Sequence, residues 1–299
     1  MVTVLRRAAA LALAAGAAAL AAACGGNPGR QDGDGIPPGP PPALPVEEYM
    51  PSPRQIAEDG WARTVLMARC LERFGIDSAY PDRRVLRGPA TRTERRYGTP
   101  DAARAREWGY WLPGDDTAPQ DAAPGAAENQ VSSGTVAEYA GRKVPEGGCH
   151  GEAVRALDGP DATPQTYGDA LRTANDMELA AYERARRHPQ VRKAEQMWAA
   201  CMADKGYDLP ADVFSASDRL DLPPVRPRPD PSSPEIATAV ADAACMGEAS
   251  VAVVWQTVEA ACQREEIVKD PAKWEGVRRT YRAHFANVER VLRDNPPRG

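Results

Sequence analysis

The sequence predicts an all-α protein, on three observations. Apolar residues recur every three to five positions along most of the chain after Ser52, which is the spacing of one helix face. Several of these runs begin at a Ser, Thr or Asp followed by Pro, which are residue types that start helices. No stretch alternates apolar and polar residues as a half-buried strand would. The chain has 299 residues, 42% of them apolar, so it can bury a core, while its 29 prolines indicate polar linkers.

The first helix is predicted to begin after Ser52. This residue is an N-cap, Pro53 presets the first turn, and Gln55 completes a capping box. Gly75 ends the run. The apolar face consists of Ile56, Trp61, Val65, Ala68, Leu71 and Phe74.

A second helix is predicted over residues 99–108, with Pro100 in its first turn and Gly109 as its stop. Residues 113–133 are rich in Pro, Ala, Asp and Ser, and we expect them to add nothing to the core.

Two more helices follow in the middle of the chain. One begins at Thr163-Pro164, and Pro189 restarts the chain for the other. Their apolar faces are Tyr167, Leu171, Ala174, Ala181 and Ala185, and then Val191, Ala194, Trp198 and Cys201.

The C-terminal region has the clearest periodicity. One long helix is predicted around residues 240–262, and Asp270-Pro271 starts another. Because the break between them is short, we expect the two to fold back as an antiparallel hairpin. The two stripes are Val240, Ala244, Gly247, Val251, Trp255, Val258 and Cys262, and then Trp274, Val277, Tyr281, Phe285, Val288 and Leu292.

The N-terminus has the features of a secretory signal peptide over residues 1–23. Arg6-Arg7 precede a short Ala/Leu run, which is too weakly apolar for a membrane span. Leu20-Ala-Ala-Ala-Cys24 resembles the lipobox of bacterial lipoproteins, with Leu20 one position further from the cysteine than usual. The resemblance implies cleavage before Cys24 and a diacylglyceryl group on its sulfur. An ordinary signal peptide cut near Ala23 is the alternative, and the twin arginines lack the surroundings of a twin-arginine signal.

Residues 24–51 are expected to form a lipid-anchored, disordered Pro/Gly-rich tether. Proline and glycine dominate this segment, which has few core-forming side chains. Asp32-Gly-Asp34-Gly lacks the later ligands of a calcium loop, so a linker is the better interpretation.

The helical region, residues 52–295, contains a repeat that divides it at about 52–160 and 163–295. The sequence Cys70-Leu-x-x-x-Gly matches Cys201-Met-x-x-x-Gly. Further along, Cys149-His-Gly-Glu-Ala matches Cys245-Met-Gly-Glu-Ala. Two cysteines that match in both halves indicate a duplication, with the Pro-rich insert in the first half.

The repeat predicts the disulfides Cys70–Cys149 and Cys201–Cys245, because it demands equivalent partners. Cysteines of an exported protein are usually oxidised. The alternative is a metal site, but the cysteines are scattered and only His150 lies beside one of them, so no metal is expected.

Cys262 is the odd cysteine once Cys24 carries lipid. It lies on an apolar stripe and is expected to be a buried free thiol, with a reactive or intermolecular cysteine as the alternative.

Catalytic motifs of the common hydrolase, kinase and nucleotide-binding families are absent from the sequence. The three histidines, His150, His188 and His284, are expected to cap or pack, although each could be a general base. The sequence therefore favours a protein without enzymatic activity, and it predicts no cofactor.

Two features of the sequence are candidates for an active site or a binding site. Glu152 and Glu248 occur at equivalent repeat positions, so they could form the carboxylate pair of a cell-wall hydrolase, or they could lie at helix starts. Arg95-Arg96-Tyr97-Gly98 could contact an anionic wall polymer, but a solvated loop with local pairing is the more common outcome for such a cluster.

The lipobox, the tether, the Arg95–Gly98 cluster, Trp198-x-x-Cys201-Met-x-x-x-Gly-Tyr and Glu259-x-x-x-Gln263-x-x-x-Ile together resemble predicted secreted lipoproteins of high-GC Gram-positive (actinobacterial) bacteria. The resemblance covers roughly residues 1–292 and agrees with the bias toward Arg, Ala and Pro. It implies a location and supplies no catalytic residues.

These observations predict a lipid-anchored protein on the extracytoplasmic face of the cell membrane. The expected role is a binding or scaffolding module of the cell envelope, and its partner an envelope protein or a cell-wall polymer. A formal net charge of −5 argues against nucleic acid. The negative charge also means that the lipid, rather than a basic patch, would hold the protein at the membrane. A solute-binding lipoprotein of a transporter would need repeated βα units, which the sequence lacks.

Overall fold

The structure, a computed structural model, describes residues 43–77, 91–94, 96–98, 101–111, 125–217, 230 and 233–296. The predicted signal peptide, the lipidation site Cys24 and most of the tether lie outside the described residues. The described chain is helical apart from one small hairpin, so the all-α prediction is confirmed. The elements are η1 Pro45–Glu48, α1 Pro53–Glu72, α2 Ala102–Trp108, α3 Ala126–Ser133, β1 Glu138–Tyr139, β2 Arg142–Lys143, α4 Gly148–Asp158, α5 Pro164–Arg186, α6 Pro189–Asp204, α7 Val213–Ser217, α8 Pro234–Glu248, α9 Val251–Lys269 and α10 Pro271–Asp294.

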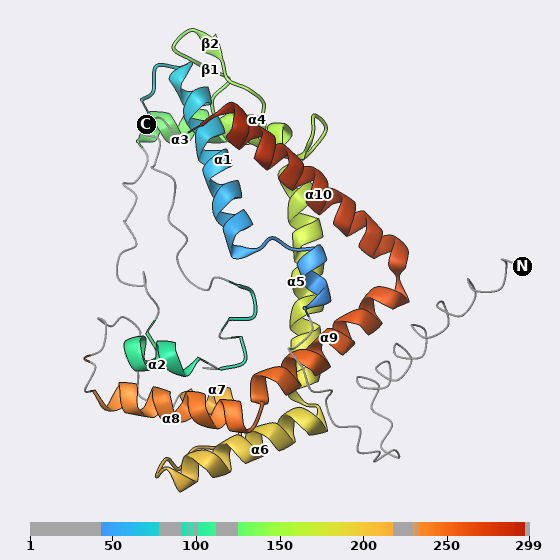
Figure 1. Ribbon diagram of the computed structural model, residues 1–299. Helices are drawn as coiled ribbons and strands as arrows, with labels where there is room; N and C mark the ends of the chain where they lie inside the picture. Colours follow the sequence, from blue (N-terminus) through green and yellow to red (C-terminus); the bar gives the residue numbers. More distant parts are fainter. Residues whose placement is uncertain are drawn as a thin grey trace, which may run out of the picture.

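The helices gather into two lobes at opposite ends of the molecule (Figure 1). The first lobe contains α1, α3, α4 and the hairpin, and the second contains α2, α6, α7 and α8. The long helix α5 runs from one lobe to the other, and α9 and α10 make a second, bent connection beside it (Figure 1). Each lobe has its own apolar core.

Local sequence accounts for the starts of the long helices. Ser52 and Gln55 form the predicted capping box of α1, with the Gln55 N–H donating to Ser52 Oγ at 3.2 Å. The face of α1 is buried as predicted except for Ile56, which is 57% exposed. Helix α2 begins later than predicted, because the Asp101 carboxylate accepts the N–H groups of Ala103 and Arg104 and so caps it.

Two segments predicted to lie outside the core are part of it, and one hairpin was not predicted at all. Residues 44–50 were assigned to the tether, yet Leu44 and Val46 are fully buried against α5, α9 and α10. Helix α3 falls in the stretch expected to be without core, and its Val131 is fully buried. The hairpin is too short to give an alternating pattern: its strands have two residues each, joined by Ala140 and Gly141 at positive φ.

The C-terminal region differs from the prediction in two ways. The long helix breaks at Ser250, whose φ is +52°, and α8 and α9 meet at a bend of 57°. Helix α10 does not fold back along α9, because its apolar face packs on α5, α1 and α4 instead (Figure 1). In the described part of the chain no single helix is long and apolar enough to cross a membrane, whereas the bent pair α8–α9 meets those criteria only when taken together.

The repeat extends to backbone detail. Gly75 after α1 and Gly206 after α6 both have positive φ, at 73° and 90°. In both places the next N–H donates to a carbonyl five residues earlier, from Ile76 to Leu71 and from Tyr207 to Met202. This is the Schellman arrangement that ends helices, so both halves use the same stop signal.

The two sequence halves are nevertheless interlocked. Helix α2 belongs to the first half but packs against α8 of the second. Helix α10 belongs to the second half but packs against α1 and α4 of the first. The predicted boundary near residue 160 therefore divides the sequence and not the core.

Candidate functional site

Both predicted disulfides are present. Cys70 at the end of α1 is bonded to Cys149 in the first turn of α4, with a Cα–Cα distance of 5.5 Å. Cys201 on α6 is bonded to Cys245 on α8, with a Cα–Cα distance of 5.6 Å. Each lobe is thus closed by the same bond at the equivalent repeat position.

The predicted free thiol at Cys262 is wrong, because the structure has this cysteine disulfide-bonded. Its side chain is fully buried on α9.

Glu152 and Glu248 do not form a carboxylate pair. Glu152 lies on α4 in the first lobe and Glu248 on α8 in the second (Figure 1). Glu152 accepts a hydrogen bond from Arg73 Nη2 at 2.6 Å, whereas Glu248 lies 3.4 Å from Cys201 Sγ. The helix-start interpretation is also wrong for Glu248, which is the last residue of its helix. The two carboxylates therefore lie in different lobes and do not face each other as the predicted pair would.

The arginine–tyrosine motif and the Glu259–Gln263 motif contact each other. Arg96 donates from Nη2 to Glu259 Oε1 at 2.8 Å and from Nε to Oε2 at 3.1 Å. The Tyr97 hydroxyl donates to the same carboxylate at 2.9 Å. Gln263 Nε2 donates to Glu259 Oε1, and Gln263 Oε1 accepts the N–H of Val46 at 2.9 Å. Every one of these bonds involves a fully buried side chain of α9.

A second carboxylate extends this buried arginine–glutamate network. Glu178 on α5 is 7% exposed and pairs with Arg92 at 3.3 Å and with Arg96 at 3.1 Å. Burial lowers the pKa of Arg96, but the bonds to Glu259 and Glu178 outweigh it, so the pKa lies above its ordinary value. Arg96 and Tyr97 are not a solvated loop, because Tyr97 is buried and the partly buried Arg96 is paired with Glu259 and Glu178. Arg95 lies outside the described residues.

A buried histidine joins three helices. His284 on α10 is 1% exposed, and its Nδ1 lies 2.5 Å from Asp158 of α4. Its Nε2 lies 3.0 Å from Asp59 of α1, and its ring stacks on Tyr167 with centroids 3.8 Å apart. Burial lowers the pKa of His284, but the bonds to Asp158 and Asp59 raise it above the ordinary value. No substrate can reach a ring so enclosed, and its place is structural.

The other histidines are simpler. His188 is the N-cap of α6, and its Nδ1 accepts the Gln190 N–H at 3.3 Å, as the capping prediction expects. His150 is exposed in the first turn of α4. Among the described residues no group of three or more His, Cys, Asp or Glu side chains could hold a metal ion.

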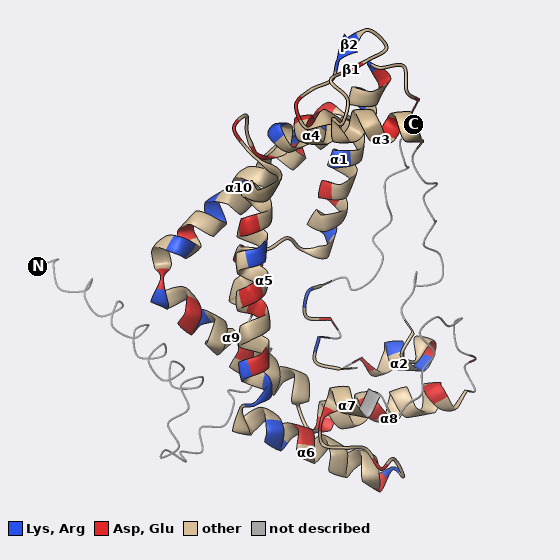
Figure 2. Ribbon diagram, turned by 180° about the vertical axis from the view of Figure 1, so that it is seen from behind, with Lys and Arg blue, Asp and Glu red and all other residues tan. Residues whose placement is uncertain are grey.

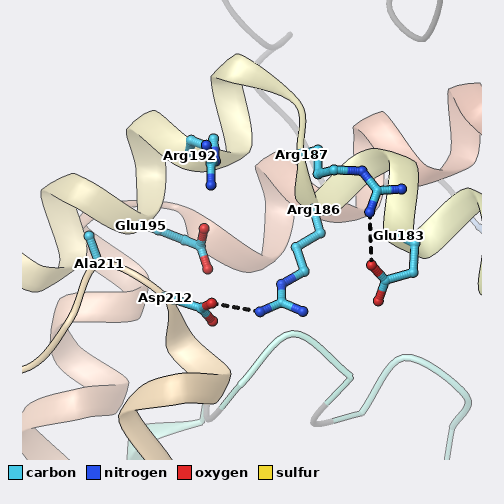
Figure 3. Close-up of a pocket in the computed structure, with 7 residues that line it drawn as sticks. All are labelled: Glu183, Arg186, Arg187, Arg192, Glu195, Ala211 and Asp212. Carbon is cyan, nitrogen blue, oxygen red and sulfur yellow. Dashed lines mark hydrogen bonds and ion pairs between the residues drawn. The ribbon is translucent and has the colours of Figure 1, made fainter.

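One polar cleft lies where α5 turns into α6. Its lining comes from the last turn of α5, from α6 and from the loop before α7, and it has a volume of about 160 Å³ (Figure 3). Arg186 pairs with Asp212 at 2.6 Å, and Arg187 pairs with Glu183 at 3.3 Å. We call it the α5–α6 cleft, and its residues are Glu183, Arg186, Arg187, Arg192, Glu195, Ala211 and Asp212.

Sequence reasoning did not find this cleft, because its charges come from three segments and form no local motif. The only sequence signal is the close spacing of arginines at 184, 186, 187 and 192 around the predicted break at Pro189.

Comparison with known proteins gives no further assignment. No family model, no curated protein and no solved structure matches the chain.

Proposed function

We propose that the protein is an extracytoplasmic lipoprotein, anchored to the cell membrane through Cys24, that works as a binding or scaffolding module of the cell envelope. The lipobox-like segment and the signal-like N-terminus carry the proposal. The resemblance to secreted actinobacterial lipoproteins agrees with it.

The disulfides support an exported protein. They cross-link segments 79 and 44 residues apart, and Cys70, Cys149 and Cys245 are at most 1% exposed. Bonds of this kind persist in oxidising compartments and are rare where thiols are kept reduced. By the chain-entropy model each stabilises the fold by about 4 kcal/mol. An alanine-rich core, which buries little apolar area per residue, benefits from this stabilisation.

The interior supports a non-catalytic role. The side chains best suited to acid–base chemistry, His284 and Glu259, are buried and held by structural partners. Acidic and basic residues both occur along α9 and α10 (Figure 2). A partner would therefore bind to the outer surface of the helices or in the α5–α6 cleft.

Membrane fractionation tests the anchoring. The full chain is expressed in a bacterial host that processes lipoproteins, together with Cys24→Ser and the matched control Asn27→Ala. We expect the wild type and N27A in the membrane fraction and C24S released from it. Equal release of the wild type, or membrane retention of C24S, would overturn the proposal.

A further inference from the structure

The α5–α6 cleft has balanced charges, and this limits what it can bind. Three guanidinium groups and three carboxylates line it, so a ligand carrying only one sign of charge meets as much repulsion as attraction. A volume of about 160 Å³ is below the 300–1,000 Å³ typical of larger ligands. The cleft therefore suits a small molecule that carries both charges.

Two of the six charged side chains, Arg192 and Glu195, form no close ion pair with a described side chain, although the charge of Arg192 acts on Glu195. Arg186 and Arg187 are engaged by Asp212 and Glu183. The Arg192 side chain is exposed on α6 and forms no hydrogen bond or ion pair with another described residue. Its guanidinium points into the same space as the Glu195 carboxylate (Figure 3). An exposed guanidinium without an ion pair can bind the carboxylate of a ligand with two parallel hydrogen bonds.

Glu195 provides the opposite charge from a buried position. It is 3% exposed, although it lines the cleft, and its Oε1 accepts the Val213 N–H at 3.2 Å. Burial raises the pKa of Glu195 above its ordinary value, and the Val213 N–H and the charges of Arg186 and Arg192 offset this only in part. A carboxylate taken out of water gains most from a cationic partner, and no described side chain forms an ion pair with it.

We propose that the α5–α6 cleft binds a small zwitterion of the free α-amino acid class, with its ammonium group at Glu195 and its carboxylate at Arg192. Arg186, held by its ion pair with Asp212, lines the cleft beside these two side chains (Figure 3). This site does not depend on the lipid anchor, so it stands or falls separately from the proposed location.

Calorimetric titration of the disulfide-intact protein with L-alanine tests the site. Acetate, methylammonium and inorganic phosphate serve as single-charge probes. We expect L-alanine to bind with a Kd of about 1 mM or tighter, and each single-charge probe at least about tenfold more weakly. Failure of L-alanine to bind, or binding of acetate or phosphate as tight as that of L-alanine, overturns the proposal.

Variants assign the two ends. R192A removes an exposed side chain and should weaken L-alanine binding by about tenfold or more, whereas R192K should restore part of it. R172A is the matched control: Arg172 is an exposed arginine of α5, paired with Asp169, about 20 Å along the helix from Arg186. E195Q, with folding checked by its Tm, should weaken L-alanine binding without weakening acetate binding, because it removes a carboxylate that repels acetate. Wild-type affinity in R192A and E195Q, or equal loss in R172A, overturns the assignment.

Discussion

Arg96 and Glu259 lie 163 residues apart in the sequence and form a two-bond ion pair at 2.8 and 3.1 Å inside the fold. The pair fastens the segment before α2 to α9, and Tyr97 adds a third bond to the same carboxylate. Two motifs that were unrelated in the sequence are therefore one structural unit.

Glu259→Gln should destabilise the protein by about 3 kcal/mol, because it removes the fully buried carboxylate that Arg96 and Tyr97 both bond, and leaves Glu178 as the only carboxylate paired with Arg96 among the described residues. The measurement is urea unfolding of both proteins. Glu289→Gln on the exposed face of α10 is the control, and its free energy of unfolding should stay within about 0.5 kcal/mol of the wild type. An E259Q value as close to wild type as that would show that the pair adds no stability.

His284 should make stability depend on pH. Its pKa is raised in the folded state, so its contribution is complete below the unfolded value of about 6.5 and is lost as pH rises through the folded pKa. The pKa of Asp59 is lowered, because the bonds from His284 and Arg63 outweigh burial. The Asp59 contribution is therefore present above about pH 4 and is lost as pH falls through its folded pKa.

Unfolding free energies at several pH values test this. His284→Asn should cost about 3 kcal/mol near pH 5 and distinctly less at alkaline pH, since the lost interaction is then already weak in the wild type. His150→Asn, at an exposed site, should follow the wild type throughout. A cost of H284N that is the same at every pH would contradict a charged histidine between the two aspartates.

Gly148 should not tolerate a side chain. Its φ is +68°, and a Cβ there would lie 2.4 Å from the backbone of Ser132 and Gly134, where α3 meets α4. Gly148→Ala should cost about 3 kcal/mol or more. Gly60→Ala is the matched control, because this helical glycine has nothing within 4 Å of a Cβ, and it should stabilise by about 0.5–1 kcal/mol. Thermal unfolding compares the two, and a harmless G148A would show that α3 does not pack on α4 as described.

The two disulfides should contribute independently to the free energy of unfolding, since they cross-link different lobes. The pair C70S/C149S and the pair C201S/C245S should each cost about 4 kcal/mol, and their effects should add. A peptide map made without reductant checks the pairing first. Fragments that join Cys70 to Cys201, or Cys149 to Cys245, would contradict the assigned bonds.

The sequence predicted the features that depend on residues a few positions apart, such as the starts and ends of helices. The capping box at Ser52 and the stops at Gly75 and Gly206 are written within a few positions. The disulfide pairing followed from the repeat, because equivalent cysteines must have equivalent partners.

What escaped prediction depends on contacts between distant segments. The apolar stripe of residues 240–262 continues through the break at Ser250, so periodicity alone could not reveal the bend. The His284 cluster and the α5–α6 cleft each draw on segments with no shared motif. Contacts with α9 bury Tyr97 in the core and bury Arg96 in part, although the sequence alone showed only a polar cluster.

Mass spectrometry of the chain purified from a bacterial membrane tests the central claim, export and lipid anchoring, most directly. The account predicts a polypeptide that begins at Cys24, without residues 1–23, and carries a diacylglyceryl group on that sulfur. An intact Met1 end without fatty modification would contradict it. A peptide that links Cys24 to Cys262 would also contradict it, because a sulfur in a disulfide cannot carry the lipid.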